Sequence, residues 1–165
     1  MLGFGIMSVR AGSFAFGTPI LWVLGCAVVL PSPLLIRFVI AEALNDRMLH
    51  DTYFVVGPSP WALELAAIFG FFAAWYYLFP KVSGYAYSAL LGKVHFWLSF
   101  IGFITMFVAQ VMLLLAIVGR VEDASDPLRR WNLTSSIGGD VFAAGFLVFF
   151  ANMALSLVRK QPAAE

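Results

Sequence analysis

Residues 94–118 read VHFWLSFIGFITMFVAQVMLLLAIV and contain no Asp, Glu, Lys or Arg. A helix needs about 20 mostly apolar residues to cross a hydrocarbon core about 30 Å thick. This stretch is long enough, and its two most polar residues are His95 at its start and Gln110 inside it. It therefore predicts a helix that spans a membrane.

The composition of the whole chain agrees with that prediction. Of its 165 residues, 62% are hydrophobic and only 12% are charged, whereas soluble domains are about 45–50% apolar and about 25% charged. A net charge of +1 gives no electrostatic case for binding nucleic acid. Cys26 is the single cysteine, which excludes a disulfide framework and any multi-cysteine metal site within one chain. We expect an integral membrane protein with the lipid bilayer as a partner, and no nucleic-acid partner.

The apolar character of 94–118 recurs along the chain. Four stretches are long and apolar enough to span: 19–40, 60–80, 94–118 and 137–158. The segments between them are polar or charged: 41–57, 81–93 and 119–136. The pattern predicts an all-α membrane protein with four transmembrane helices in a single domain, residues 1–165. Since residues 1–14 lack a basic start followed by an unbroken apolar stretch, we expect no cleaved signal peptide.

Local signals refine these stretches. Pro31 and Pro33 lie inside the first one and predict a kink or an end of its regular helix. Before the last one, Thr134, Ser135 and Ser136 are expected N-caps of the final helix.

Four spans place both termini on the same side of the membrane. The Lys and Arg counts of the two sides are equal, but all three lysines lie on the side of the termini, and the arginines opposite them are mixed with acids. Because acids count for little in the positive-inside rule, we favour cytoplasmic termini, in a bacterial inner membrane.

Two acids stand inside the predicted spans, Glu64 and Asp140. Intramembrane acids are candidates for function by default. Both are expected within about one turn of the same membrane face, where they can reach water or pair with Arg37, Arg120 or Arg130. We favour structural pairing over a proton-transfer or partner-binding role.

Other polar and small residues have structural explanations. Gln110 and Asn152 are expected to form interhelical hydrogen bonds, and His95 is expected to be a structural interface histidine. A haem ligand at His95 would need a partner on a facing helix, and His50 lies on the opposite side of the membrane. A close helix contact face is expected from the small residues Gly138, Gly139, Ala143, Ala144 and Gly145.

Residues 48–61, MLHDTYFVVGPSPW, lead into the second predicted span and open with a compact polar cluster. His50 and Asp51 are metal-capable residues at a membrane edge. Pro58 and Pro60 suit the first turn of the next helix, where a missing N–H costs nothing.

Several short motifs, found in order along the chain, are similar to those of a known protein family. They are Gly12-Ser13, TPILW (18–22), LHDTYFVV (49–56), KVSGYAY (81–87), LGKVHFWLSFIG (91–102) and WNLTSSIG (131–138). Through them the sequence resembles the C-terminal part of subunit I of haem-copper respiratory oxidases of the cytochrome c oxidase type. The resemblance implies that the four spans correspond to the last four of the family's twelve transmembrane helices.

The departures from the family bear directly on function. In the family, the HDTY motif is followed by a His-x-His pair whose histidines are proximal ligands of the two haems, and those positions fall here on Pro58 and Pro60. Proline offers no side-chain donor to iron, so haem ligation through these positions is lost. The resemblance thus implies a truncated, degenerate homologue without the haem-ligand pair.

The resemblance also implies two lesser sites. Of the family's Arg-Arg pair that holds haem propionates, Arg120 remains. His50 and Asp51 match residues near a magnesium or manganese site, but hard cations need several oxygen ligands. We therefore favour an interfacial hydrogen-bonded turn there and keep a magnesium or manganese ion as the alternative.

Three functions follow from these residues. The leading hypothesis is a haemless, subunit-I-like structural or accessory subunit of a respiratory oxidase, with other membrane subunits as partners and haem and copper held by a partner subunit. It assigns this chain no catalytic residue and no cofactor of its own. The alternatives are the C-terminal piece of a split haem-copper oxidase that takes part in electron transfer to oxygen, and an independent membrane protein that binds lipid, quinone or another subunit.

Overall fold

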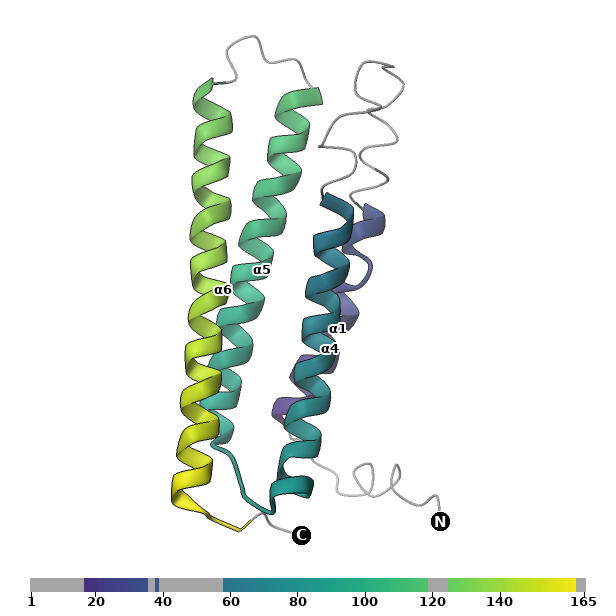
Figure 1. The fold of residues 1–165 in the computed structure, drawn as a ribbon. Helices are drawn as coiled ribbons and strands as arrows, with labels where there is room; N and C mark the ends of the chain where they lie inside the picture. Colours follow the sequence, from purple (N-terminus) through teal and green to yellow (C-terminus); the bar gives the residue numbers. More distant parts are fainter. Residues whose placement is uncertain (1–16, 36–37, 39–57, 119–124, 163–165) are drawn as a thin grey trace.

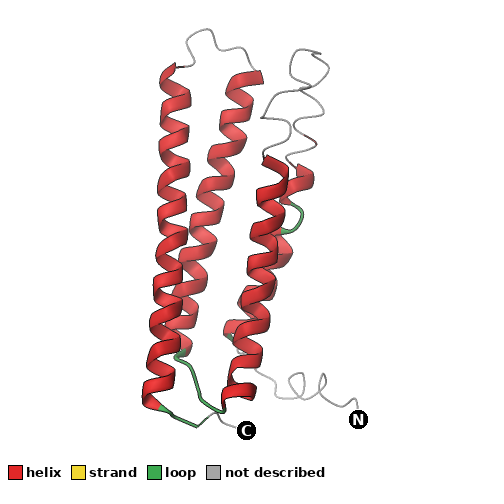
Figure 2. Cartoon of the chain, viewed as in Figure 1, coloured by secondary structure: helices red, strands yellow, loops and turns green. Residues whose placement is uncertain are grey.

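The chain forms long helices that run nearly side by side (Figures 1 and 2). The computed structural model describes residues 17–35, 38, 58–118 and 125–162. The named helices are α1 (Thr18–Val29), α4 (Pro58–Ser83), α5 (Ala89–Val118) and α6 (Ser125–Arg159). Four helical segments are long and apolar enough to cross a membrane: Thr18–Leu35, Leu63–Ser83, Ala89–Ala116 and Leu128–Arg159. The predicted all-α membrane fold is confirmed.

The first span is broken at its prolines, as the sequence predicts. Helix α1 ends at Val29, and helical structure resumes at Ser32 after a turn. Pro33 has no N–H to donate to the carbonyl of Val29, four residues earlier. The hydroxyl of Ser32 donates to that carbonyl oxygen instead, at 2.6 Å, so the break leaves this buried acceptor satisfied.

The predicted connection 119–136 is wrong over its second half, because α6 already begins at Ser125. Thr134 and Ser136 are therefore not N-caps. Their hydroxyls donate to the carbonyl oxygens of Arg130 and Asn132, four residues earlier in the same helix. Such back-bonding lets Ser and Thr sit inside a helix, which makes the N-cap signal ambiguous in sequence.

The helices pack in two pairs, α5 with α6 and α1 with α4 (Figure 1). Glycines set the spacing of the first pair. A Cβ added to Gly102 of α5 would lie 2.7 Å from the carbonyl oxygen of Gly138 and 2.6 Å from the amide nitrogen of Phe142. The two backbones therefore touch, as is typical where small residues meet in membrane helices.

The predicted small-residue face is confirmed at Gly138 and Gly145, which are buried against α5. It is wrong at Ala143, which is exposed on the opposite side of α6. A run of small residues this long wraps around a helix, and only part of it can face one neighbour.

Aromatic side chains join the two pairs. Trp22 of α1 is fully buried, and its ring centroid lies 5.1 Å from that of Phe69, 4.8 Å from Phe72 and 5.4 Å from Phe96. Trp75 of α4 donates its indole N–H to the sulfur of Met153 on α6 at 3.3 Å. These contacts make one core from the two pairs.

Candidate functional site

Three of the residues singled out in the sequence, His50, Asp51 and Arg120, lie outside the described residues. Pro58 and Pro60 are placed in the first turn of α4. The first helical turn needs no donor from these residues, so both prolines are compatible with the helix start.

The two intramembrane acids are both exposed. Within the described ranges, no ion pair joins Glu64 or Asp140 to another residue, so the predicted pairing with Arg130 is wrong. The cause is the early start of α6 at Ser125, which puts Asp140 about four turns into the helix rather than one. Arg37 and Arg120, the other predicted partners, lie outside the described residues.

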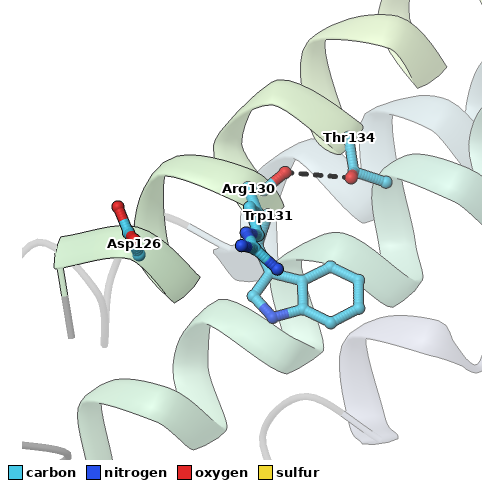
Figure 3. A pocket seen from close by; sticks show the side chains of 4 residues that line it. All are labelled: Asp126, Arg130, Trp131 and Thr134. Atoms are coloured by element: carbon cyan, nitrogen blue, oxygen red, sulfur yellow. Dashed lines mark hydrogen bonds between the residues drawn. The ribbon is translucent and has the colours of Figure 1, made fainter. Parts of the chain in front are cut away.

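A recess lies beside the first turns of α6. It has a volume of about 460 Å³ and is lined by Asp126, Arg130, Trp131 and Thr134. Figure 3 shows Arg130 and Trp131 next to each other, Asp126 about a turn earlier, and the Thr134 hydroxyl bonded to the Arg130 carbonyl. The Thr134 hydroxyl already donates its proton, so the guanidinium of Arg130, the indole N–H of Trp131 and the carboxylate of Asp126 are the side-chain groups that can bind a polar ligand.

The strongest concentration of polar groups is buried, where α1, α4, α5 and α6 meet. His95 of α5 is fully buried, and a hydrogen bond of 3.0 Å joins its Nδ1 to the phenol oxygen of Tyr76 on α4. Rings surround the imidazole at centroid distances of 4.6 Å for Trp22, 4.5 Å for Phe72 and 5.3 Å for Phe149. The structure thus gives His95 a structural role, but in the core and not at the membrane interface.

Four buried polar atoms of this region have no hydrogen-bond partner among the described residues: Thr18 Oγ1, Trp22 Nε1, His95 Nε2 and Ser99 Oγ. Buried polar groups are rarely left unpaired, and ordered water usually satisfies those without a protein partner. The cluster can therefore bind water, in a part of the bundle that is otherwise aromatic.

Sequence reasoning missed this cluster. It singled out His95 but not its partner Tyr76, which is only 1% exposed. A signal was present, because His95, Ser99 and Gly102 recur at helical spacing and mark one polar and small face of the third span.

Asn152 of α6 binds the connection between α4 and α5. Its side-chain oxygen accepts the N–H of Ser88 at 3.0 Å, and its amide nitrogen donates to the carbonyl of the same residue at 3.2 Å. Ser156 donates to the carbonyl oxygen of Ala86 at 2.7 Å, and the N–H of Ala86 donates to the carbonyl oxygen of Gln161 at 2.8 Å. The connection is thereby fixed to the end of α6.

The second predicted interhelical polar residue behaves as expected. Gln110 of α5 donates to the hydroxyl of Ser135 on α6 at 3.3 Å. This bond lies toward the opposite end of the α5–α6 pair from Asn152. Polar contacts thus fix the register of this pair near both of its ends.

The described residues do not fit a haem or a metal ion. Proline at positions 58 and 60 provides no ligand, and the imidazole of His95 is packed against aromatic rings at centroid distances of 4.5 to 5.3 Å. No group of three or more His, Cys, Asp or Glu side chains converges within the part of the chain that the structure describes.

Helices of membrane-spanning length around an aromatic core define an all-helical integral membrane protein. Residues 2–157 match the family model described as cytochrome c and quinol oxidase polypeptide I. The chain belongs to this family.

Relatives within the family include three proteins named cytochrome c oxidase subunit 1. That of Cereibacter sphaeroides is 34% identical over 93% of this chain and 27% of its own length. The relative from Eremothecium gossypii is 33% identical over 87% of this chain and 27% of its own length. The relative from Debaryomyces hansenii is 30% identical over 92% of this chain and 28% of its own length. The chain therefore spans about a quarter of the length of these three relatives.

Proposed function

We propose that this chain is a haemless, subunit-I-like accessory or structural membrane subunit of a cytochrome c oxidase-type respiratory complex. The observation that carries the proposal is the first turn of α4. There, Pro58 and Pro60 occupy the positions at which the family resemblance places the two haem-ligating histidines. A polypeptide that has the family fold but no haem ligand at these positions contributes to the complex by packing against other subunits.

The core supports the same proposal. His95 is one of only two histidines in the chain, and its Nδ1 is bonded to Tyr76 inside an aromatic cage. The rings of Trp22, Phe72 and Phe149 lie at centroid distances of 4.6, 4.5 and 5.3 Å from this imidazole, which supports a packing role for His95. In this proposal, haem and copper belong to a partner membrane subunit, and both termini of this chain lie on the cytoplasmic side of a bacterial inner membrane.

The test is gentle purification of the native complex through an affinity tag on this chain, followed by a visible spectrum and identification of the co-purified polypeptides. We expect an oxidase subunit with its own complete set of haem ligands in the preparation, and haem absorbance that disappears when that subunit is removed.

Three results would contradict the proposal. Haem that stays with the isolated chain would show that it binds the cofactor itself. Co-purification with a polypeptide that carries only the family's first eight helices would instead support a split oxidase. A preparation without any oxidase polypeptide would leave an independent lipid- or quinone-binding protein as the better explanation.

A further inference from the structure

Asp140 lies deep in the membrane-spanning part of α6. Arginines mark both ends of this span, Arg130 and Arg159. At about 1.5 Å per residue they are about 43 Å apart, and a hydrocarbon core of about 30 Å centred between them places Asp140 about 8 Å inside the core. At this depth the side chain is beyond easy reach of the water at either face.

The carboxylate points away from the rest of the chain. On α6, Gly138 and Phe142 are buried against α5, whereas Asp140 is exposed. Figure 1 shows α6 at one edge of the described helices, so no other described element covers its outer face. Exposed residues at helical spacing share that face with Asp140, and they are Leu133, Ser136, Ile137, Ala143 and Leu147.

Lipid is an unfavourable neighbour for this face. Acids within transmembrane segments are rare, and they almost always face a bundle interior or an aqueous cavity and pair with another group. Within the described chain, Asp140 neither faces the bundle interior nor pairs with another group. Its neighbours Ser136 and Ala143 are small, so another helix could approach the carboxylate closely.

The described residues of a second copy of this chain offer no cation at the depth of Asp140. Its described cations lie at or beyond the ends of the spans: Lys81, Lys93, Arg129, Arg130, Arg159 and Lys160. None of them is at the depth of Asp140. The described cations thus favour a different polypeptide as the source of the complementary charge.

We propose that the outer face of α6 around Asp140 is the surface that docks this chain onto a transmembrane helix of another subunit, one that carries a Lys or Arg at the depth of Asp140. The inference deepens the proposed accessory function, on which it rests for the identity of the partner complex. The carboxylate and the cation form an ion pair within the membrane, and the small residues beside Asp140 allow the two helices to approach.

The experiment uses the native complex, purified through a tag on this chain, with a photo-reactive amino acid at Ala143. We expect a cross-link to a transmembrane helix with a Lys or Arg within about one turn of the linked residue. Asp140→Leu should lower both the cross-link and the yield of that subunit at least tenfold. Asp140→Asn should retain more of both, since an amide still forms hydrogen bonds.

Glu64→Gln is the matched control, because Glu64 is the other exposed acid within a described span and lies near the start of that span. It should leave the cross-link and the yield unchanged. The thermal transition of each purified variant checks folding, and Asp140→Leu should not lower it in the isolated chain.

Several outcomes would overturn the inference: cross-links from Ala143 only to lipid or to a second copy of this chain, a linked helix without a cation, or an undiminished yield with Asp140→Leu. If the oxidase subunits still co-purify in that last case, the proposed function stands and only this docking surface fails. If Ala143 cross-links to a cationic helix of a protein unrelated to respiratory oxidases, the surface stands and the proposed function fails.

Discussion

His95 shows at the scale of one residue how its surroundings decide what a polar side chain does. An imidazole in a membrane protein of this family invites a cofactor-binding role. Here its Nδ1 is bonded to Tyr76, and aromatic rings from three helices enclose it. The hydrogen bond between His95 and Tyr76 joins α5 to α4 inside the bundle.

Removing the phenol should therefore destabilise the bundle. Tyr76→Phe leaves a buried imidazole nitrogen without its partner, which costs about 1–3 kcal/mol. We expect a clearly lower unfolding temperature in mild detergent. Tyr77→Phe is the control, because Tyr77 is 47% exposed and its change should stay within about 0.5 kcal/mol. Equal effects of the two substitutions would refute the structural role of the pair.

At the scale of the elements, contacts between backbones define the α5–α6 pair. Gly102 and Gly138 bring the helices together, Gln110 bonds across them, and Asn152 fixes the connection at one end. The pair is therefore specified by close contact as well as by apolar surface.

Gly102→Ala should force the α5–α6 pair apart. The added methyl group would lie 2.6 Å from the Phe142 amide, and overpacking of this kind costs about 1–3 kcal/mol. Gly70→Ala is a matched control in α4, because the nearest atom to its new Cβ is the Cys26 sulfur at 3.8 Å. Thermal unfolding should show a loss for the first variant and no loss for the second, and a stable Gly102→Ala would show that the pair is looser than described.

Asn152→Ala should release the connection between α4 and α5. The substitution removes both hydrogen bonds to Ser88, so the amides of this segment should exchange with deuterium faster. Asn132→Ala, at an exposed position of the same helix, should leave the exchange unchanged. Protection that survives Asn152→Ala would mean that the bonds from Ser156 and Gln161 suffice.

At the scale of the whole molecule, the described charges other than Glu64 and Asp140 lie toward two opposite ends. Lys81, Lys93, Arg159 and Lys160 lie at one end, where no described acid is found, and Asp126, Arg129 and Arg130 lie at the other. The start of α1 and the end of α6 both lie at the lysine-rich end (Figure 1). The charge pattern favours placing this end in the cytoplasm.

Cysteine labelling tests that orientation. Cys26→Ala leaves a chain without cysteine, into which Arg159→Cys or Asp126→Cys is introduced. With a membrane-impermeant maleimide applied from outside intact inner-membrane spheroplasts, we expect the Asp126→Cys chain to react and the Arg159→Cys chain to react only after permeabilisation. The reverse pattern would place the termini outside.

The sequence by itself determined the four spans, the helical class and the family, because each rests on apolar runs or on motifs that stay together along the chain. It also located the break at Pro31 and Pro33, since proline acts on its own backbone. It did not locate the start of α6 at Ser125, because hydroxyls that can cap a helix can equally bond within one.

Only the tertiary structure decided which residues share a face. It enclosed Tyr76 with His95, brought Gly102 against Gly138, and left Asp140 exposed on the outer side of α6. A polar residue within an apolar run is equally compatible with the bundle interior, the membrane surface or a partner. The choice depends on how the helices rotate against one another, which is set by contacts between residues far apart in the chain.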